Sequence, residues 1–166
     1  MSNGQVCRSG MFPPGFISIE RIGCCLEIAS KKRILQHLGE LLASGQPGLA
    51  PDAVFDRLLE RERLGSTGLG HGIALPHARM PHVQQAVGAF IRLREGVDFD
   101  AVDDRPVDLA FALLVPQEAT EEHLQLLARL ATLFNDERFC EQLRQAQNTE
   151  QLLASIQEWE TSFKGP

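Results

Sequence analysis

The sequence predicts an α/β protein of a single domain, in which helices cover a small apolar sheet. Two observations lead to this prediction. Apolar residues recur with helical spacing before residue 65 and again after residue 119. Between these regions lie short, strongly apolar segments that indicate strands buried on both faces. Helices on either side of such strands favour a layered domain, although the order of the strands does not follow from this pattern.

The composition is that of an ordinary globular protein. The chain has 166 residues, of which 43% are hydrophobic and 23% are charged. Its net charge of -6 argues against a general nucleic-acid binder, because such proteins usually carry a basic surface. The longest apolar run, residues 109–115, is too short to cross a bilayer, and the N-terminus lacks the features of a secretory signal. We therefore expect a cytoplasmic protein with no membrane insertion.

The cysteines do not indicate a disulfide framework. They occur at positions 7, 24, 25 and 140, without the spacing typical of disulfide-rich domains. In the cytoplasm such residues are reduced thiols. Cys24 and Cys25 are neighbours in the chain and are not expected to bridge each other.

The domain is predicted to span residues 16–160, between a loose leader at 1–15 and a tail at 161–166. A Pro-Pro-Gly sequence at 13–15 punctuates the end of the leader. The two short segments that follow, residues 16–19 and 25–28, are ambiguous, and either could be an edge strand.

Two helices come next. Ser30 is a suitable N-cap for an amphipathic helix that ends at the glycines of residues 45–48. Pro51 is a suitable first residue for a second helix. Gly65 is placed to end that second helix.

The later elements are three strands followed by three helices. Strands are predicted at residues 73–75, 86–93 and 107–115, the last of them after a turn at 103–106. Thr120 is predicted to cap a long helix. A shorter helix is expected at 136–146, and Thr149 is predicted to cap the final one.

The most informative segment links the second helix to the first of these strands through glycines 65, 68, 70 and 72. Glycine lets a backbone turn tightly and approach a ligand closely. His77 follows the strand directly, after Pro76. A neutral imidazole is a good nucleophile near neutral pH. We therefore predict that His77 accepts a phosphoryl group and passes it on.

Phosphoryl transfer requires donors that meet the added negative charge. Arg61, at the end of the preceding helix, can fork onto phosphate oxygens, although periodicity barely separates it from Arg63. The amides of the glycine loop and the hydroxyls of Ser66 and Thr67 are candidate phosphate ligands. His123 lies near a predicted helix N-terminus, which attracts anions. This chemistry needs neither a metal nor a cofactor.

Other kinds of site are poorly supported. No Gly-Lys-Ser/Thr follows the glycines, so they are not a Walker loop, and they follow a helix rather than the strand of a dinucleotide site. Ser66 does not lie in a Gly-x-Ser-x-Gly elbow. No His-x-x-x-His or Cys-x-x-Cys motif supports a metal centre.

The stretch Arg-Glu-Arg-Leu-Gly-Ser-Thr-Gly-Leu-Gly-His-Gly-Ile-Ala-Leu-Pro-His-Ala, residues 61–78, resembles the signature of fructose/mannitol-type enzyme IIA domains of the bacterial phosphotransferase system. Residues 118–128 resemble the second conserved block, and residues 99–103 and 107–116 are most similar to the nitrogen-regulatory branch. The resemblance covers residues 16–158. It implies a mixed sheet between helices, an α/β/α sandwich. It also implies that His77 is phosphorylated, that Arg61 contacts the phosphoryl group and that His123 is the second active-site histidine.

The resemblance further implies a phosphotransferase whose donor is a small histidine phosphocarrier of the HPr type. Members of the nitrogen branch are typically free-standing regulators of nitrogen, carbon or potassium status. Their targets are proteins such as sensor kinases or potassium-transport components. His71 stands where the branch often has Asn. Two alternatives remain: a sugar-specific enzyme IIA that feeds a IIB domain, and an interaction module of the same fold that transfers no phosphate.

Overall fold

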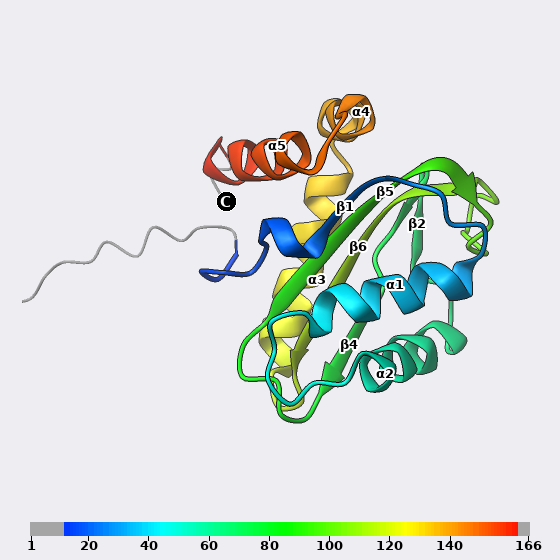
Figure 1. The fold of residues 1–166 in the computed structure, drawn as a ribbon. Helices are drawn as coiled ribbons and strands as arrows, with labels where there is room; N and C mark the ends of the chain where they lie inside the picture. The colour runs from blue at the N-terminus through cyan, green and yellow to red at the C-terminus, as the bar shows by residue number, and fades with distance from the viewer. Residues whose placement is uncertain (1–11, 163–166) are drawn as a thin grey trace, which may run out of the picture.

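The computed structural model describes residues 12–162, with side chains to residue 161. The elements are, in chain order, the 3-10 helix η1 (Ile19–Arg21), β1 (Ile22–Leu26), α1 (Lys31–Ala43), α2 (Pro51–Arg63), β2 (Gly68–Gly70), β3 (Ile73–Ala74), β4 (His77–Met80), β5 (Val87–Val97), β6 (Val107–Pro116), α3 (Thr120–Phe134), α4 (Glu137–Gln145) and α5 (Thr149–Ser162). They form one α/β layered domain (Figure 1).

The six strands form one mixed sheet in the order β1-β5-β6-β3-β2, and β4 also pairs with β6. β5 and β6 are antiparallel and form the centre of the sheet. β1 is parallel to β5, while β3 and β4 are both parallel to β6. The mixed sheet between helices confirms the predicted fold class.

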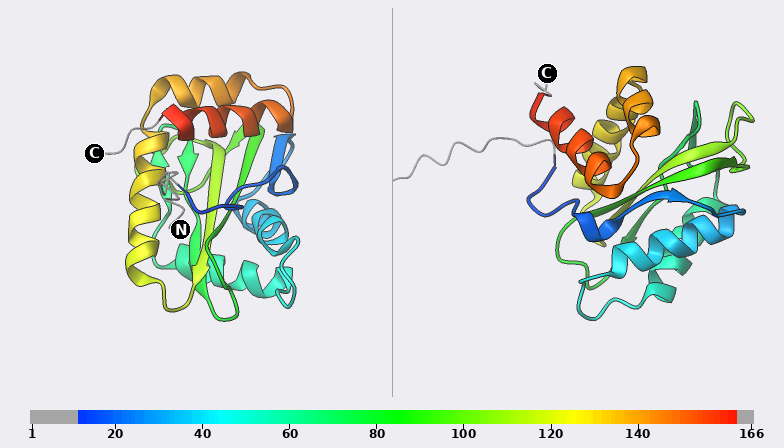
Figure 2. Two further views of the ribbon diagram at one scale, coloured as in Figure 1. Left: turned by 90° about the vertical axis from the view of Figure 1, so that its left-hand side faces the viewer. Right: turned by 45° about the horizontal axis from the view of Figure 1, so that its top comes forward.

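The sheet is covered on both faces. Alternate residues of β6 point to opposite sides: Leu109, Phe111 and Leu113 join the core shared with α3, α4 and α5, whereas Ala110 and Ala112 join the core shared with α1 and α2. Figures 1 and 2 show these two helical layers on opposite sides of the strands. Burial on both faces explains why β6 is almost entirely apolar.

Two helix starts agree with the sequence prediction and two differ by one residue. The Ser30 hydroxyl accepts a hydrogen bond from the amide of Arg33 at 3.2 Å, and Pro51 is the first residue of α2. The predicted cap at Thr120 is wrong, because Ala119 is the N-cap and Thr120 is already helical. Similarly, α5 begins at Thr149, and the side chain before it, Asn148, accepts the bond from the amide of Gln151 at 2.9 Å.

The three predicted strands are confirmed as β3, β5 and β6, but β2 and β4 were not predicted, and β1 overlaps the ambiguous segment 25–28 only at residues 25 and 26. β2 is bounded by glycines and β4 has only four residues, so neither carries a strong strand signal. The existence of β4 changes the setting of His77. This residue is the first of a strand that pairs with β6, not a residue beyond a strand's end.

The start of the described chain is packed, not loose. Phe12 is buried and stacks on Phe16, with ring centroids 4.7 Å apart. Its amide also donates to the carboxylate of Glu160. The rest of the predicted leader up to residue 11, including Cys7, and the end of the predicted tail lie outside the described residues.

Candidate active site

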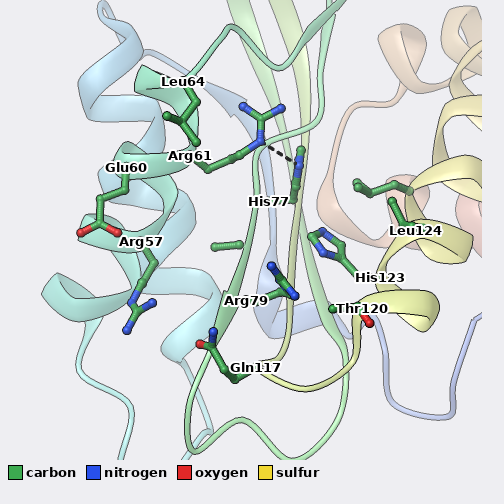
Figure 3. Close-up of a pocket in the computed structure, with 12 residues that line it drawn as sticks. Arg57, Glu60, Arg61, Leu64, His77, Arg79, Gln117, Thr120, His123 and Leu124 are labelled. Carbon is green, nitrogen blue, oxygen red and sulfur yellow. Dashed lines mark hydrogen bonds between the residues drawn. The ribbon is translucent and has the colours of Figure 1, made fainter.

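A pocket of about 520 Å³ opens where the end of α2, the start of β4 and the start of α3 meet (Figure 3). It brings together the three residues that the sequence predicted for phosphoryl chemistry, His77, Arg61 and His123. The full lining is Arg57, Glu60, Arg61, Leu64, His77, Ala78, Arg79, Gln117, Thr120, His123, Leu124 and Leu127.

The ring of His77 is held in one tautomer. Its Nδ1 lies 2.8 Å from the carbonyl oxygen of Leu75. Because a carbonyl can only accept, Nδ1 carries the proton and Nε2 keeps its lone pair. That lone pair points to the pocket side, where Nε of Arg61 donates to it at 3.2 Å (Figure 3). The ring nitrogen of His77 that keeps a lone pair is therefore Nε2.

Arg61 is fixed at two points. Besides its bond to His77, its Nη1 donates to the carbonyl oxygen of Gly65 at 2.9 Å. The carbonyl belongs to the loop that follows α2, so the turn after the helix orients the guanidinium. A cation is thereby held beside Nε2 of His77, where a fork of N–H donors can meet an anion.

His123 lies on the other side of His77. The two ring centroids are 5.2 Å apart at an interplanar angle of 65°. Nε2 of His123 is buried and has no hydrogen-bond partner among the described residues. The residue sits in the first turn of α3, where the helix N-terminus favours anions. The pocket therefore contains a polar nitrogen with an unused bonding position.

Burial and neighbouring cations keep both rings neutral. Desolvation is the main cause that lowers the pKa of His77, and the positive charge of Arg61 lowers it further, against the opposing bond to Leu75. Burial, followed by the charges of His77, Arg79 and Arg61, lowers the pKa of His123 to about 4. At neutral pH His77 is thus unprotonated at Nε2, as a nucleophile must be.

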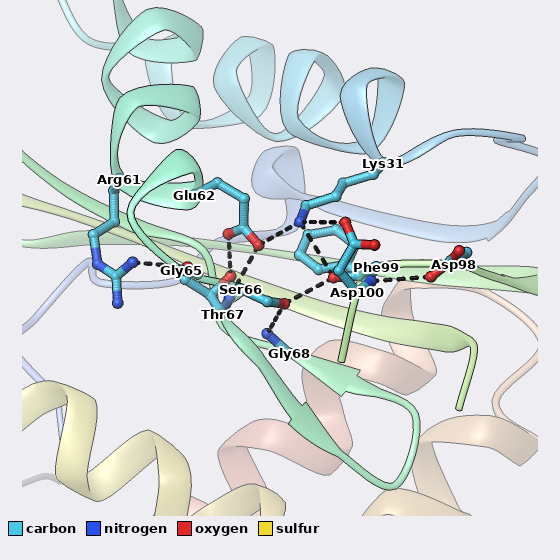
Figure 4. A network of polar contacts seen from close by, with 10 residues as sticks. All are labelled: Lys31, Arg61, Glu62, Gly65, Ser66, Thr67, Gly68, Asp98, Phe99 and Asp100. Atoms are coloured by element: carbon cyan, nitrogen blue, oxygen red, sulfur yellow. Dashed lines mark hydrogen bonds and ion pairs between the residues drawn. The ribbon is translucent and has the colours of Figure 1, made fainter. Parts of the chain in front are cut away.

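The structure does not bring the hydroxyls of Ser66 and Thr67 to this pocket. The Ser66 hydroxyl donates to the carbonyl of Phe99 at 2.7 Å, and the Thr67 hydroxyl donates to the buried carboxylate of Glu62 at 2.5 Å (Figure 4). The amides of Thr67, Gly68 and His71 also bond to side chains of the protein itself. In this structure both hydroxyls and these three amides are therefore bonded within the protein and do not face the pocket.

Two further arginines line the pocket and were missed by the sequence analysis. Arg79 lies two residues after His77 on β4, on the same face of the strand. Arg57 lies one turn before Arg61 on α2. Both spacings were visible in the sequence. Together with Arg61 they make the pocket cationic.

The rim of the pocket is apolar. Leu64 is 85% exposed and Leu124 is 68% exposed, although both are large hydrophobic residues. They stand on opposite sides of His77, on the end of α2 and the start of α3 (Figure 3). Such a collar can exclude water when another protein docks over the histidine.

Two other classes of site are not found within residues 12–162. No group of three or more His, Cys, Asp or Glu side chains there could hold a metal ion. Within the same residues, no helix has the length and apolar character needed to span a membrane.

Comparison with known proteins identifies the family of this chain. Residues 15–159 match the family described as phosphoenolpyruvate-dependent sugar phosphotransferase system, EIIA 2. The nitrogen regulatory protein of Escherichia coli K12 is 46% identical over 132 residues, which are 79% of this chain and 80% of that protein.

Two solved structures have the same fold. The nitrogen regulatory protein IIA-Ntr of Neisseria meningitidis matches with a TM-score of 0.80 and 45% identity, covering 85% of this chain and 96% of that one. The mannitol enzyme IIA of Escherichia coli, in its complex with phosphorylated enzyme IIB, matches with a TM-score of 0.71 and 26% identity, covering 84% of this chain and 96% of that one. This chain therefore belongs to the type 2 enzyme IIA family of the phosphotransferase system and is similar to its nitrogen regulatory members.

Proposed function

We propose that this protein carries a phosphoryl group on Nε2 of His77 and that its phosphorylation state selects its protein partners. The observation that supports this most strongly is the fixed tautomer of His77, whose free lone pair lies between Arg61 and His123. The phosphoryl donor is an HPr-type histidine phosphocarrier. The regulatory targets are proteins such as sensor kinases or potassium-transport components.

The transfer step needs little rearrangement. The lone pair on Nε2 of His77 attacks phosphorus, and the P–N bond of the donor breaks with its electron pair returning to the donor imidazole. The proton on Nδ1 stays in its bond to Leu75, which stabilises the positive ring that results. Arg61 turns its donors from Nε2 to the phosphoryl oxygens, and the free Nε2 of His123 supplies a further hydrogen bond.

Phosphorylation changes the charge of a docking surface. The phosphoryl group adds about -1.5 to -2 charge, by analogy with other phosphorylated side chains. It does so in a pocket lined by Arg57, Arg61 and Arg79 and rimmed by exposed leucines. A partner that recognises the cationic pocket would lose affinity, whereas a partner with its own cations would gain it.

The direct test is incubation with a phosphorylated HPr-type donor. We expect one adduct that is labile in acid and stable in base, and that is lost in His77→Ala. His37→Ala, a substitution in helix α1 outside the lining of the pocket, is the matched control and should keep the adduct. Absence of any adduct on the wild-type protein would leave the interaction module of the same fold as the better description.

The alternative function is sugar uptake, in which the phosphoryl group passes on to a IIB domain. It is favoured by the match to the mannitol enzyme IIA that was solved with phosphorylated IIB. The phosphorylated protein should be offered purified IIB domains of the mannitol and fructose types. Rapid onward transfer would support the transport role, and retention of the phosphoryl group would support the regulatory one.

A further inference from the structure

Edge strand β1 contains a bulge that places two cysteines side by side. Gly23 pairs with Ile91 of β5 but Leu26 pairs with Leu93, so three steps along β1 match two along β5. Cys24 and Cys25 occupy the irregular part of the strand. In a regular strand their side chains would point to opposite faces. Here Cys25 has a φ of 58° and the two sulfurs lie 2.9 Å apart.

This backbone conformation is costly for a residue with a side chain. A non-glycine residue in the left-handed region is strained unless its surroundings hold it there. From the sequence, Cys24 and Cys25 were not expected to form a disulfide. The bulge changes this expectation, because it directs both thiols to the same side.

The surroundings distinguish the two sulfurs. Nη1 of Arg92 donates to Sγ of Cys25 at 3.5 Å, so a guanidinium lies beside this sulfur. Burial, and secondly the contact with Cys25, raises the pKa of Cys24 to about 11. Both cysteines are partly exposed, next to the backbone carbonyls of Ala146 and Gln147 in the α4–α5 connection. Because the raised pKa keeps Cys24 in its thiol form, Cys25 is the attacking thiol and Cys24 the resolving thiol.

We propose that Cys24 and Cys25 form a vicinal dithiol that low-molecular-weight disulfides oxidise to an intrachain disulfide. The Cys25 thiolate attacks one sulfur of the small disulfide, whose S–S bond breaks and releases one thiolate. Cys24 gives its proton to that released thiolate and attacks the Cys25 sulfur, which displaces the second half of the small molecule as a thiolate that takes up the proton Cys25 had lost. Two protein thiols are oxidised and one small disulfide is reduced to two thiols.

The bridge is expected to be readily reversed. Neighbouring Cα atoms across a trans peptide are about 3.8 Å apart, below the separation of about 4.4–6.8 Å usual for disulfides. A strained bridge of this kind is easier to reduce, as labile and regulatory disulfides are. Cys140 provides the contrast, because it is 3% exposed, donates to the carbonyl of Phe134, and has its pKa raised to about 11 chiefly by burial.

This site is separate from the phosphoryl pocket. β5 and β6 lie between β1 and β4, the strand that carries His77. The proposal therefore does not depend on phosphoryl transfer.

The test uses the full chain, treated with oxidised glutathione, quenched with an alkylating reagent and cleaved with trypsin. Cleavage after Arg21 and Lys31 leaves both cysteines on one peptide, residues 22–31. We expect this peptide to lose the mass of two hydrogens and to regain it with dithiothreitol. Cys24→Ser should instead accumulate a glutathione adduct on Cys25, and Cys25→Ser should react at least about tenfold more slowly at Cys24.

The tryptic peptides of the wild-type protein are enough to overturn the proposal, so the test does not depend on variants that might misfold. A peptide that stays reduced, one that stops at the glutathione adduct, or a disulfide that joins either cysteine to Cys7 would each do so. Cys7→Ser and Cys140→Ser are the matched controls and should still form the bridge.

Discussion

Two neighbouring residues at the end of α2 have opposite surroundings. Arg61 faces the pocket, where its guanidinium contacts His77 and a loop carbonyl. Glu62 faces the interior and is 5% exposed. Its carboxylate accepts bonds from the amide and hydroxyl of Thr67 and pairs with Lys31 at 2.9 Å (Figure 4). Arg61 thus belongs to the pocket, and Glu62 belongs to a buried cluster of polar groups that bond one another.

The difference lies in whether each polar group is matched within the protein. Around Glu62 both carboxylate oxygens have partners. In the pocket, Nε2 of His123 is buried without a partner among the described residues. The lining contains three arginines but one carboxylate, that of Glu60. A buried polar group without a partner is costly, so it is expected mainly where a ligand completes its bonding. The comparison teaches that the polar groups around Glu62 are satisfied within the protein, whereas the pocket beside Arg61 keeps bonding capacity that a ligand could use.

The largest effect should come from Arg61→Ala. Removal of a fixed cation that meets developing charge typically lowers a rate by about 10²–10³-fold. We expect a loss of this size in phosphoryl transfer to His77, measured by rapid-quench kinetics with a phosphorylated HPr-type donor. Thermal unfolding should change little, because Arg61 contacts only exposed or partly exposed groups.

Arg61→Lys sharpens this prediction. Lysine keeps the charge but cannot hold both His77 and the Gly65 carbonyl with one planar fork. Transfer should therefore be intermediate between wild type and Arg61→Ala. A normal rate in Arg61→Ala, or a loss explained by unfolding, would remove Arg61 from the mechanism and weaken the comparison with Glu62.

The next largest effect is on stability, from Glu62→Ala. This change leaves the buried amide and hydroxyl of Thr67 without their acceptor and removes one of the partners of Lys31, which keeps Asp100 and the carbonyl of Phe99. Breaking a buried pair in this way costs about 3 kcal/mol. The unfolding free energy from urea titration should fall by that amount. The rate of phosphoryl transfer should fall only to the extent that the end of α2 becomes less ordered.

Glu60→Ala is the matched control, because Glu60 is exposed on the same helix. Its effect on stability should stay within about 0.5 kcal/mol. Equal destabilisation by the two substitutions would show that the Glu62 cluster has no special structural role.

The same contrast explains what the sequence could predict. The glycine loop and the strand after it drew attention to His77, and the predicted helix N-terminus drew attention to His123, whereas the choice of Arg61 over Arg63 rested on the family resemblance; the structure brings these three residues together in one pocket. Strand β4 was missed since its pairing with β6 is a long-range contact that no local pattern encodes. The layers were predictable because helical spacing and apolar strands reflect burial directly.

The internal partners of the Ser66 and Thr67 hydroxyls were not predictable for a related reason. A loop hydroxyl next to a histidine could bond a ligand or the protein, and only the position of Glu62 decides between them. His71, in contrast, is explained by its local backbone conformation. Its φ of 57° is a conformation in which Asn and His are both enriched, so a histidine fits where the related branch often has Asn.

A smaller effect is expected from His123→Ala. His77 should still be phosphorylated, because its nucleophile and Arg61 remain. Loss of one hydrogen bond to a charged group removes about 1.5 kcal/mol, or roughly a tenfold change in rate. Transfer rates and the lifetime of the phosphorylated protein should be compared with Gln125→Ala, an exposed position on the same helix. Identical values in both variants would exclude His123 from the site.

The smallest effect concerns the pH dependence of stability. The pKa of His123 is lowered to about 4 in the folded protein, so the unfolded chain binds the proton first as pH falls below about 6.5. The contribution of the neutral ring is therefore complete above about pH 6.5 and is lost as pH falls toward 4. The lowered pKa of His77 acts in the same direction.

The difference between wild type and His123→Ala isolates this contribution from all other titrating groups. Solvent screens a half-buried ring, so the wild type should lose less than about 1 kcal/mol more than the variant between pH 7 and about pH 5.5. Urea midpoints at these two pH values measure it. Equal losses of stability in wild type and His123→Ala between the two pH values would mean that His123 is solvated like a surface histidine. The pocket would then lack the unsatisfied polar nitrogen that distinguishes it from the Glu62 cluster.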